Sequence, residues 1–280
     1  MSCLGDSMTG FDQFIKEREY LHNVSPRTLE WYKSSLRCLP CETPTQAQLD
    51  DVVIRMRQRG RKPTGVNCVG RAVNAYLRWS GSSCKIRLLK EAQCVLPTFS
   101  DPQVRMLLSW RPQTKEQKRL HLILMLLLDT GARISEALTL RVRDVDLNNL
   151  LMTVTGKGAK QRIVPFSLEL RKAVFRYIGE FNRAPERLLF ASRNETLLSR
   201  QNVARDAKLL CRKLGFEPPI RTLHAARHTF GSTYARRGGN VFALQRVLGH
   251  STLEMTRRYV HTTTADLQAA HERLSPLARP

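Results

Sequence analysis

The sequence predicts a mainly α-helical protein with one small β-hairpin or sheet, an α+β class, arranged as two domains. Apolar residues first recur at helical spacing through the N-terminal third of the chain. The pattern fades over residues 80–100, where Gly81 and Pro97 favour a linker. Further helical patterns follow and are interrupted over residues 145–166 by two β-like runs around a glycine-rich turn. The expected boundaries are a helical domain over 1–90, a linker over 91–100 and a second domain over 101–280.

Four helices are expected in the first domain. They correspond to "FDQFIKEREYL", "SPRTLEWYKSSL", "TQAQLDDVVIRM" and "TGVNCVGRAVNAYLRW", each with an apolar stripe at helical spacing. Ser25 is the expected N-cap of the second helix, with Pro26 at its first position. Thr45 and Gln48 have the spacing of a capping box for the third. Between the last two lies "RMRQRGRKP", a dense basic run that fits either a solvated face or phosphate contact.

The second domain is expected to mix helices with a hairpin. Ser100 and Gln103 have capping-box spacing at the start of "SDPQVRMLLSW", and Ser251 and Glu254 have it at the start of "TLEMTRRY". The runs "LLMTV" and "QRIVPF", joined by "TGKGAK", are typical of a hairpin. After the hairpin, helices are expected near residues 168–180, 200–214, 223–237, 241–248, 252–259 and 265–274.

The charge balance favours a polyanionic partner. The chain has 46 Lys and Arg against 24 Asp and Glu, a net charge of +22, spread along its length. Nucleic acid is the leading candidate and an anionic membrane the weaker one, because no basic helix with a bulky apolar face stands out. The longest apolar block, "LHLILMLLLDTG", is too short to span a bilayer, and "MSCLGDSMTG" lacks the features of a signal peptide.

The seven cysteines are odd in number and irregularly spaced, which suits free thiols in a reducing cytoplasm. Cys38 and Cys41 form one C-x-x-C, but no second ligand pair follows at zinc-site spacing. A helix end and a turn explain this pair more simply than a metal site, so we expect neither metal nor cofactor.

Several charged residues require a specific partner. Arg133 follows the buried apolar block, where an arginine is costly unless an anion meets it, and Glu136 could hold its guanidinium. In "LHAARHTF", His224 and Arg227 share a helix face, while His228 is favoured as structural packing. A surface ion pair for Arg133 and ordinary packing for the histidines remain alternatives when each motif is taken alone.

Taken alone, Lys157 at the tip of the expected hairpin is interpreted as an ordinary basic turn residue. The "GKGAK" spacing is not that of a phosphate-binding P-loop. His250 follows the helix-ending Gly249, and Tyr259 lies two turns into the next helix. Taken together, these side chains can bind an anion and move protons without a clustered carboxylate trio of the kind that holds Mg²⁺. Arginines could then neutralise a phosphate in the transition state while a tyrosine, deprotonated by an imidazole, attacks it.

Four motifs carry a resemblance to a known family. "TGARISEAL", "GKGAKQRIVP", "LHAARHTFGS" and "VLGHSTLEMTRRYVH" occur in the order and spacing of the tyrosine recombinases, the phage-integrase and Xer-type site-specific DNA recombinases. The resemblance covers most of the chain. It implies a helical core-binding, DNA-binding domain (SAM-like) over 1–90 and a catalytic domain over 101–280.

The resemblance also implies a role for each residue. Tyr259 attacks the scissile phosphate and forms a 3′-phosphotyrosine link, while Arg133 and Arg227 hold the non-bridging oxygens. His250 assists by hydrogen bonding, and His224 helps to move the tyrosine proton. The remaining expectations are Lys157 as the acid that protonates the departing 5′-oxygen, Glu136 as a support for the catalytic residues, and Lys160 and Arg162 as contacts to the DNA backbone.

The implied partners are double-stranded DNA recombination sites and further copies of the chain or a related recombinase, as a dimer on one site and a tetramer in the synaptic complex. No metal, ATP or membrane is implied. We expect no extra arm-binding domain of the kind that some phage integrases carry, which favours an Xer-like or transposon-type layout. The alternatives are a type IB topoisomerase, which shares the tyrosine chemistry, and a non-catalytic DNA-binding protein.

Overall fold

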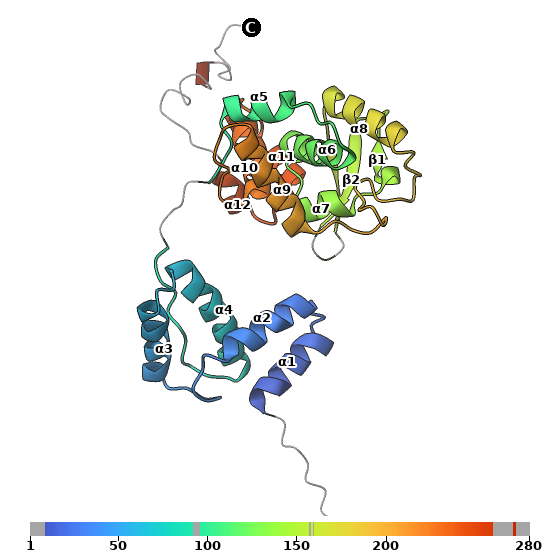
Figure 1. The fold of residues 1–280 in the computed structure, drawn as a ribbon. Helices are drawn as coiled ribbons and strands as arrows, with labels where there is room; N and C mark the ends of the chain where they lie inside the picture. The colour runs from blue at the N-terminus through green and yellow to red at the C-terminus, as the bar shows by residue number, and fades with distance from the viewer. Residues whose placement is uncertain (1–8, 92–95, 157, 159, 260–270, 273–280) are drawn as a thin grey trace, which may run out of the picture. The chain divides into compact units, whose positions relative to one another are not determined.

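The computed structural model describes residues 9–91, 96–156, 158, 160–259 and 271–272. The chain divides into two compact units, Met1–Cys94 and Val95–Pro280, drawn in Figure 1. The predicted α+β class is confirmed: helices dominate both units, and the second contains a small antiparallel sheet. Lys157 and nearly all of the helix expected over 265–274 lie outside the described residues.

The first unit contains the four predicted helices, α1 (Gly10–Tyr20), α2 (Pro26–Leu36), α3 (Gln46–Gln58) and α4 (Pro63–Trp79). The Thr45–Gln48 capping box is present at the start of α3. Ser25 occupies the N-cap position of α2 as predicted, but its hydroxyl bonds Thr28 and not a backbone N–H. The apolar face of α4 buries Val66, Val73 and Leu77 completely, so this helix organises the core of the unit.

The chain after α4 runs back along that helix. The side-chain amide of Asn74 exchanges two 2.8 Å hydrogen bonds with the backbone of Ile86, and that of Asn67 does the same with Leu89. Each amide therefore serves both backbone groups of an extended residue, as a neighbouring strand would. Ile86 is 2% exposed. The first part of the stretch that lacks periodicity is thus part of the first unit.

In the second unit, helix α6 (Lys115–Thr130) is central (Figure 1). Helices α5 (Asp101–Ser109), α7 (Ile134–Thr139), α8 (Leu168–Glu180), α9 (Arg200–Lys213) and α10 (Thr222–Arg236) all pack against it. All of its leucines except the partly buried Leu128 are buried, as expected for a helix inside a core. No helix in the described part of the chain is long and apolar enough to cross a membrane.

The sheet contains the predicted hairpin and one additional short strand. Strands β2 (Leu151–Thr155) and β3 (Gln161–Pro165) pair antiparallel, and β1 (Val145–Asp146) pairs with β2 on the other side. The short 3₁₀ turn η1 (Val142–Asp144) leads into β1. The hairpin packs against α7 through β2 and against α11 (Val241–Leu248) through β3.

Two glycines determine how the helix ends meet. Gly131 ends α6 with φ +63°, and a Cβ there would lie 2.7 Å from Leu248 Cδ2 and clash with Phe230. Gly249 ends α11 with φ +64°. Both positions need the left-handed backbone that glycine adopts without strain. Gly131 therefore lets the end of α6 approach α10 and α11 closely, and Gly249 lets the end of α11 approach the Arg162 side chain of β3.

The short helix α12 (Leu253–Arg257) follows α11. The predicted Ser251–Glu254 capping box is wrong: Thr252 occupies the N-cap, with no side-chain cap hydrogen bond, and the Ser251 hydroxyl faces the Met255 sulfur. The Ser100–Gln103 box of α5 is present as predicted. Helix α12 therefore begins one residue later than the sequence pattern indicates.

Candidate active site

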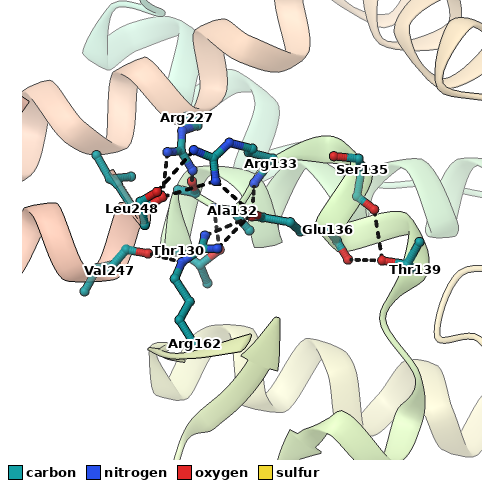
Figure 2. A network of polar contacts seen from close by, with 12 residues as sticks. Thr130, Ala132, Arg133, Ser135, Glu136, Thr139, Arg162, Arg227, Val247 and Leu248 are labelled. Atoms are coloured by element: carbon teal, nitrogen blue, oxygen red, sulfur yellow. Dashed lines mark hydrogen bonds and ion pairs between the residues drawn. The ribbon is translucent and has the colours of Figure 1, made fainter. Parts of the chain in front are cut away.

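Arg227 is a buried cation held at the ends of two helices (Figure 2). It lies on α10 and is 5% exposed. Its Nη1 donates to the Gly131 carbonyl at 2.6 Å and its Nη2 to the Leu248 carbonyl at 2.7 Å. These carbonyls belong to the C-terminal ends of α6 and α11, where the helix dipole favours a cation. Burial, reinforced by Arg133, lowers the pKa of Arg227 to about 10, so the group stays charged at neutral pH.

Glu136 is the carboxylate that organises the neighbouring arginines. It is 2% exposed and accepts hydrogen bonds from the Arg133 backbone N–H at 2.7 Å and from Arg133 Nη1 at 2.9 Å. Arg162 binds both of its oxygens, each at 2.8 Å. Burial alone would raise the pKa of Glu136, but the bonds from Arg162 and Arg133 outweigh it and lower the pKa to about 2. The carboxylate is therefore ionised at any physiological pH.

Arg162, for which a contact with the DNA backbone is expected, is bound within the protein. Its guanidinium is bound to Glu136, its Nε donates to the Val247 carbonyl at 2.8 Å, and its side chain is only 14% exposed. A side chain with its donors used in this way is a support for its neighbours. Arg162 thus connects β3, α7 and the end of α11 (Figure 2).

Arg133 is the most accessible of the three guanidiniums. Its side chain is 36% exposed, and its contacts with the Leu248 and Gly249 carbonyls are long, at 3.5 and 3.4 Å. The residues Arg133, Glu136, Arg162 and Arg227 form what we call the arginine cluster. With three cations and one anion, the cluster leaves two positive charges uncompensated by its own members. Such a group can bind a phosphodiester anion.

Tyr259 lies in a second group of residues, which we call the tyrosine pocket: Tyr259, His228, Gly231, His250 and Thr256. The tyrosine is 5% exposed, and its hydroxyl lies 2.8 Å from His228 Nδ1. The His250 ring stacks on it, with centroids 6.2 Å apart and planes at 6°, and His250 Nδ1 bonds the Thr256 hydroxyl at 2.9 Å. Burial raises the pKa of Tyr259, opposed by Arg227, Arg258 and Arg133.

Gly231 makes room for the tyrosine ring. A Cβ at this position of α10 would lie 2.8 Å from Tyr259 Cε1 and 2.9 Å from its Cζ. Because real Cβ atoms do not approach so closely, the ring can rest on α10 only where the helix carries glycine. The hydroxyl then reaches His228, one turn back along the same helix.

The two groups of residues adjoin. Arg227 and His228 are consecutive on α10, and Tyr259 packs in a small apolar cluster with Leu248, whose carbonyl binds Arg227. Of the predicted site residues, the structure brings Arg133, Glu136, Arg162 and Arg227 into the arginine cluster, and His250 and Tyr259 into the tyrosine pocket. Residues more than a hundred positions apart in sequence therefore converge at the end of α11.

The histidines differ from the expectation. His224 lies one turn before His228 on α10 and is exposed. Within the described residues, the hydrogen-bond partner of the Tyr259 hydroxyl is His228, the residue for which packing was favoured. The spacing His-x-x-Arg-His was visible in the sequence, but the contact with a residue 31 positions later was not. Lys160 is exposed and directly precedes β3, and Lys157 is outside the described residues.

Candidate metal ligands do not gather here. In the ranges that the structure describes, no three His, Cys, Asp or Glu side chains are placed to hold an ion, and Cys38 and Cys41 are free thiols. The chemistry that these residues offer is anion binding by guanidinium groups, a buried phenol and neutral imidazoles. Burial, followed by neighbouring cations, lowers the pKa of both His228 and His250 to about 4.

The site therefore combines guanidinium groups that suit a phosphodiester anion with a phenol that suits nucleophilic attack. Residues 98–266 match the phage integrase family. The tyrosine recombinase XerA of Thermococcus onnurineus is 31% identical over 279 residues, 95% of this chain and 96% of that protein. XerA of Thermococcus kodakarensis is 34% identical over 224 residues, 78% of each chain.

Solved structures show the same fold. The Tn1549 transposon integrase in complex with transposon right end DNA has a TM-score of 0.77 at 23% identity, covering 96% of this chain and 100% of that one. XerH bound to its difH substrate has a TM-score of 0.71 at 16% identity, covering 95% and 84%. The chain belongs to the phage integrase family of tyrosine recombinases. It is a DNA strand-transferring enzyme of site-specific recombination, and neither a type IB topoisomerase nor a non-catalytic DNA-binding protein is favoured.

Proposed function

We propose that Tyr259 is the nucleophile of the recombination reaction. Its phenolic oxygen attacks the scissile phosphate, which leaves a 3′-phosphotyrosine link and a free 5′-hydroxyl. Attack by the 5′-hydroxyl of a partner strand reverses the step and reseals the DNA, so the bond energy is kept in the covalent link. The observation that carries the proposal is the convergence of the phenol with the arginine cluster at the end of α11.

In this proposal the arginine cluster binds the phosphate. Arg133 and Arg227 hold the non-bridging oxygens and stabilise the charge that builds on them in the transition state. Glu136 and Arg162 fix Arg133 in place, since each guanidinium hydrogen bond to the buried carboxylate restricts its geometry. The exposed part of Arg133 is the part that the substrate would reach.

The remaining roles concern protons. His250 hydrogen-bonds the phosphate, and Thr256 sets its ring orientation through Nδ1. Lys157 protonates the departing 5′-oxygen, with Lys160 as the alternative on the same hairpin. We assign His224, exposed on α10, to the movement of protons at the edge of the site. None of these steps uses a metal ion, so cleavage should proceed in EDTA.

The proposed substrate is double-stranded DNA carrying a recombination site. The net charge of +22 supports contact along the backbone, and the structural neighbours include integrases and recombinases bound to such DNA. We further propose a dimer on one site and a tetramer in synapsis, because exchange needs two cleaved duplexes. The cytoplasm is the proposed location, since the DNA substrate is there.

Covalent capture tests the proposal. DNA bound by the protein is first selected from random duplexes, and the selected site is then remade with a nick beside the cleavage position so that cleavage traps the adduct. Wild type should give a protein–DNA adduct on a denaturing gel. Tyr259→Phe should give none while binding the duplex within about threefold of wild type, since only one hydroxyl is lost. Tyr20→Phe, at an exposed tyrosine, is the matched control. Adduct formation by Tyr259→Phe would contradict the role of Tyr259.

A further inference from the structure

His228 contacts the phenolic oxygen of Tyr259, the proposed nucleophile. Its Nδ1 lies 2.8 Å from the Tyr259 hydroxyl oxygen, and the two rings are 5.8 Å apart by centroid. The phenolic O–H can donate to Nδ1 when the imidazole carries its own proton on Nε2. His228 lies on α10 directly after Arg227, so the same helix that carries the phosphate-binding guanidinium also meets the phenol.

The surrounding residues restrict the phenol to this contact. Tyr259 is 5% exposed, so bulk water has little access to its hydroxyl. Gly231 seats the ring on α10, and the hydroxyl then falls one turn back, at His228. The Nδ1 atom of His250, the imidazole that stacks on the ring, is engaged with Thr256. Among the described residues, the base in hydrogen-bond contact with the phenol is His228.

We propose that His228 accepts the proton of Tyr259 when the phenol attacks DNA and returns it when the strand is resealed. The proposal rests on the proposed role of Tyr259. In the forward step the phenolic O–H bond breaks and an N–H bond forms at Nδ1. The phenolic oxygen bonds to phosphorus, the bond from phosphorus to the 5′-oxygen breaks, and that oxygen takes a proton from the general acid. In the reverse step each transfer runs backwards.

The electrostatic surroundings suit a base that is neutral before the reaction. Burial, followed by the neighbouring cations, lowers the pKa of His228 to about 4, so the ring is unprotonated at neutral pH. A bound phosphodiester would offset those cations and raise the basicity of the ring when DNA is in place. Two sets of titratable and charged groups surround the His228 ring. The first comes from α10 and its N-cap: Arg221, His224 and Arg227. The second comes from the segment after α11: His250, Arg258 and Tyr259.

The competing assignment is His224, which shares a face of α10 with His228. It lies one turn earlier and is exposed. A proton acceptor has to reach the phenol directly or through one water, and the structure places His228 there at 2.8 Å. The two histidines therefore give different predictions for the same substitution.

The test is single-turnover cleavage of the nicked duplex between pH 5 and 9 by wild type, His228→Asn, His228→Ala and His224→Asn. Asparagine keeps a hydrogen-bond acceptor near the position of Nδ1 but cannot take a proton. We expect His228→Asn to bind DNA normally and cleave about 100-fold more slowly at pH 7, the usual scale for a lost general base. Its rate should lose the wild-type fall at acid pH and rise steadily towards the tyrosine pKa.

Added imidazole should restore part of the activity of His228→Ala, about tenfold. His22→Asn, at an exposed histidine of the first unit, is the control, and thermal melting checks that each variant folds. Should His228→Ala fail to fold, His228→Asn and its pH profile decide. A wild-type rate in His228→Asn, or a slow rate with an unchanged pH profile, overturns the proposal, as does a larger loss in His224→Asn. Adduct formation by Tyr259→Phe would instead overturn the proposed function.

Discussion

The arginine cluster and the tyrosine pocket adjoin, yet they are built in opposite ways. In the arginine cluster, charged groups are fixed by other charges and by helix-end carbonyls, and Glu136 stays ionised down to a pH of about 2. In the tyrosine pocket, the groups are neutral at pH 7 and are held by single hydrogen bonds and ring stacking. The difference separates two tasks, because a phosphate needs fixed charge whereas a proton needs groups that change charge.

This contrast also explains where each set of residues sits. The arginine cluster draws on α6, α7, β3, α10 and α11, so its geometry depends on the core of the second unit. The tyrosine pocket depends on α10 and on the short segment that follows α11. Pre-organised charge stabilises a transition state without reorganisation during the reaction. We therefore expect substitutions in the arginine cluster to have larger effects than substitutions of the residues that surround Tyr259 in the tyrosine pocket.

After Tyr259→Phe, which removes the proposed nucleophile itself, the largest effect should come from Arg227→Gln. The change removes a buried charge and leaves the Gly131 and Leu248 carbonyls short of donors. Cleavage of the nicked duplex should fall about 1000-fold, the upper range for one lost donor at a developing oxyanion. Arg236→Gln, on the exposed side of the same helix, is the control and should cleave at the wild-type rate. Equal losses in the two variants would mean that Arg227 acts only through the stability of α10.

The second effect concerns Glu136 and pH. Its folded pKa of about 2 lies below the ordinary 4.5, so its stabilising contribution is present above pH 4.5 and is lost as the pH falls towards 2. By linkage the contribution is roughly 3 kcal/mol at neutral pH. Glu136→Gln should lower the free energy of unfolding by about that amount at pH 7, with the gap to wild type closing in acid. Urea unfolding between pH 3 and 7 measures this.

Glu169→Gln, at an exposed glutamate that pairs with Lys172, provides the control for that series. It should differ little from wild type at any pH, because exposed ion pairs contribute at most about 1 kcal/mol. A constant gap between wild type and Glu136→Gln from pH 7 to pH 3 would show that the carboxylate is not stabilised by its charge.

Local sequence signals predicted most of the fold. The capping boxes at Thr45 and Ser100 were readable because both partners lie three residues apart. The glycine-rich turn between β-like runs predicted the hairpin. The Ser251 box failed because its spacing is necessary but not sufficient: the backbone enters α12 at Thr252 instead. Interactions within one helical turn are therefore predictable from sequence. The choice between two adjacent N-cap residues, however, depends on the backbone conformation of the segment that precedes the helix.

The candidate site was predictable only through its motifs. Arg133 and Glu136 are neighbours on one helix turn, so their pairing follows from the sequence. Arg162 looked like one more basic residue of a hairpin, because its contact with Glu136 depends on how the sheet packs against α7. His228 was missed for the same reason, since its partner Tyr259 is brought to it by the path of the chain through α11 and α12. Such contacts are set by tertiary structure.

Gly231→Ala should have a smaller effect that is specific to the tyrosine pocket. The new Cβ would fall 2.8 Å from the Tyr259 ring, so the ring must move and its bond to His228 must lengthen or break. Overpacking of this kind costs about 1–3 kcal/mol. Adduct formation should fall by about 10- to 100-fold while DNA binding is kept. Gly179→Ala on α8, where a Cβ meets nothing within 4 Å, is the matched helix control. Unchanged adduct formation in Gly231→Ala would show that the tyrosine need not rest on α10.

The smallest effect is expected from Thr256→Val, which keeps the shape of a fully buried side chain and removes its hydroxyl. That hydroxyl is the partner of His250 Nδ1 at 2.9 Å, so its loss leaves the ring free to choose its tautomer and orientation. We expect a loss of about 1 kcal/mol in stability and a fall of about fivefold in cleavage rate. Thr252→Val, at an exposed threonine without a side-chain cap bond, should change neither. If Thr256→Val matched Arg227→Gln in its loss of cleavage, the tyrosine pocket would depend on fixed geometry as much as the arginine cluster does, and the contrast between them would fail.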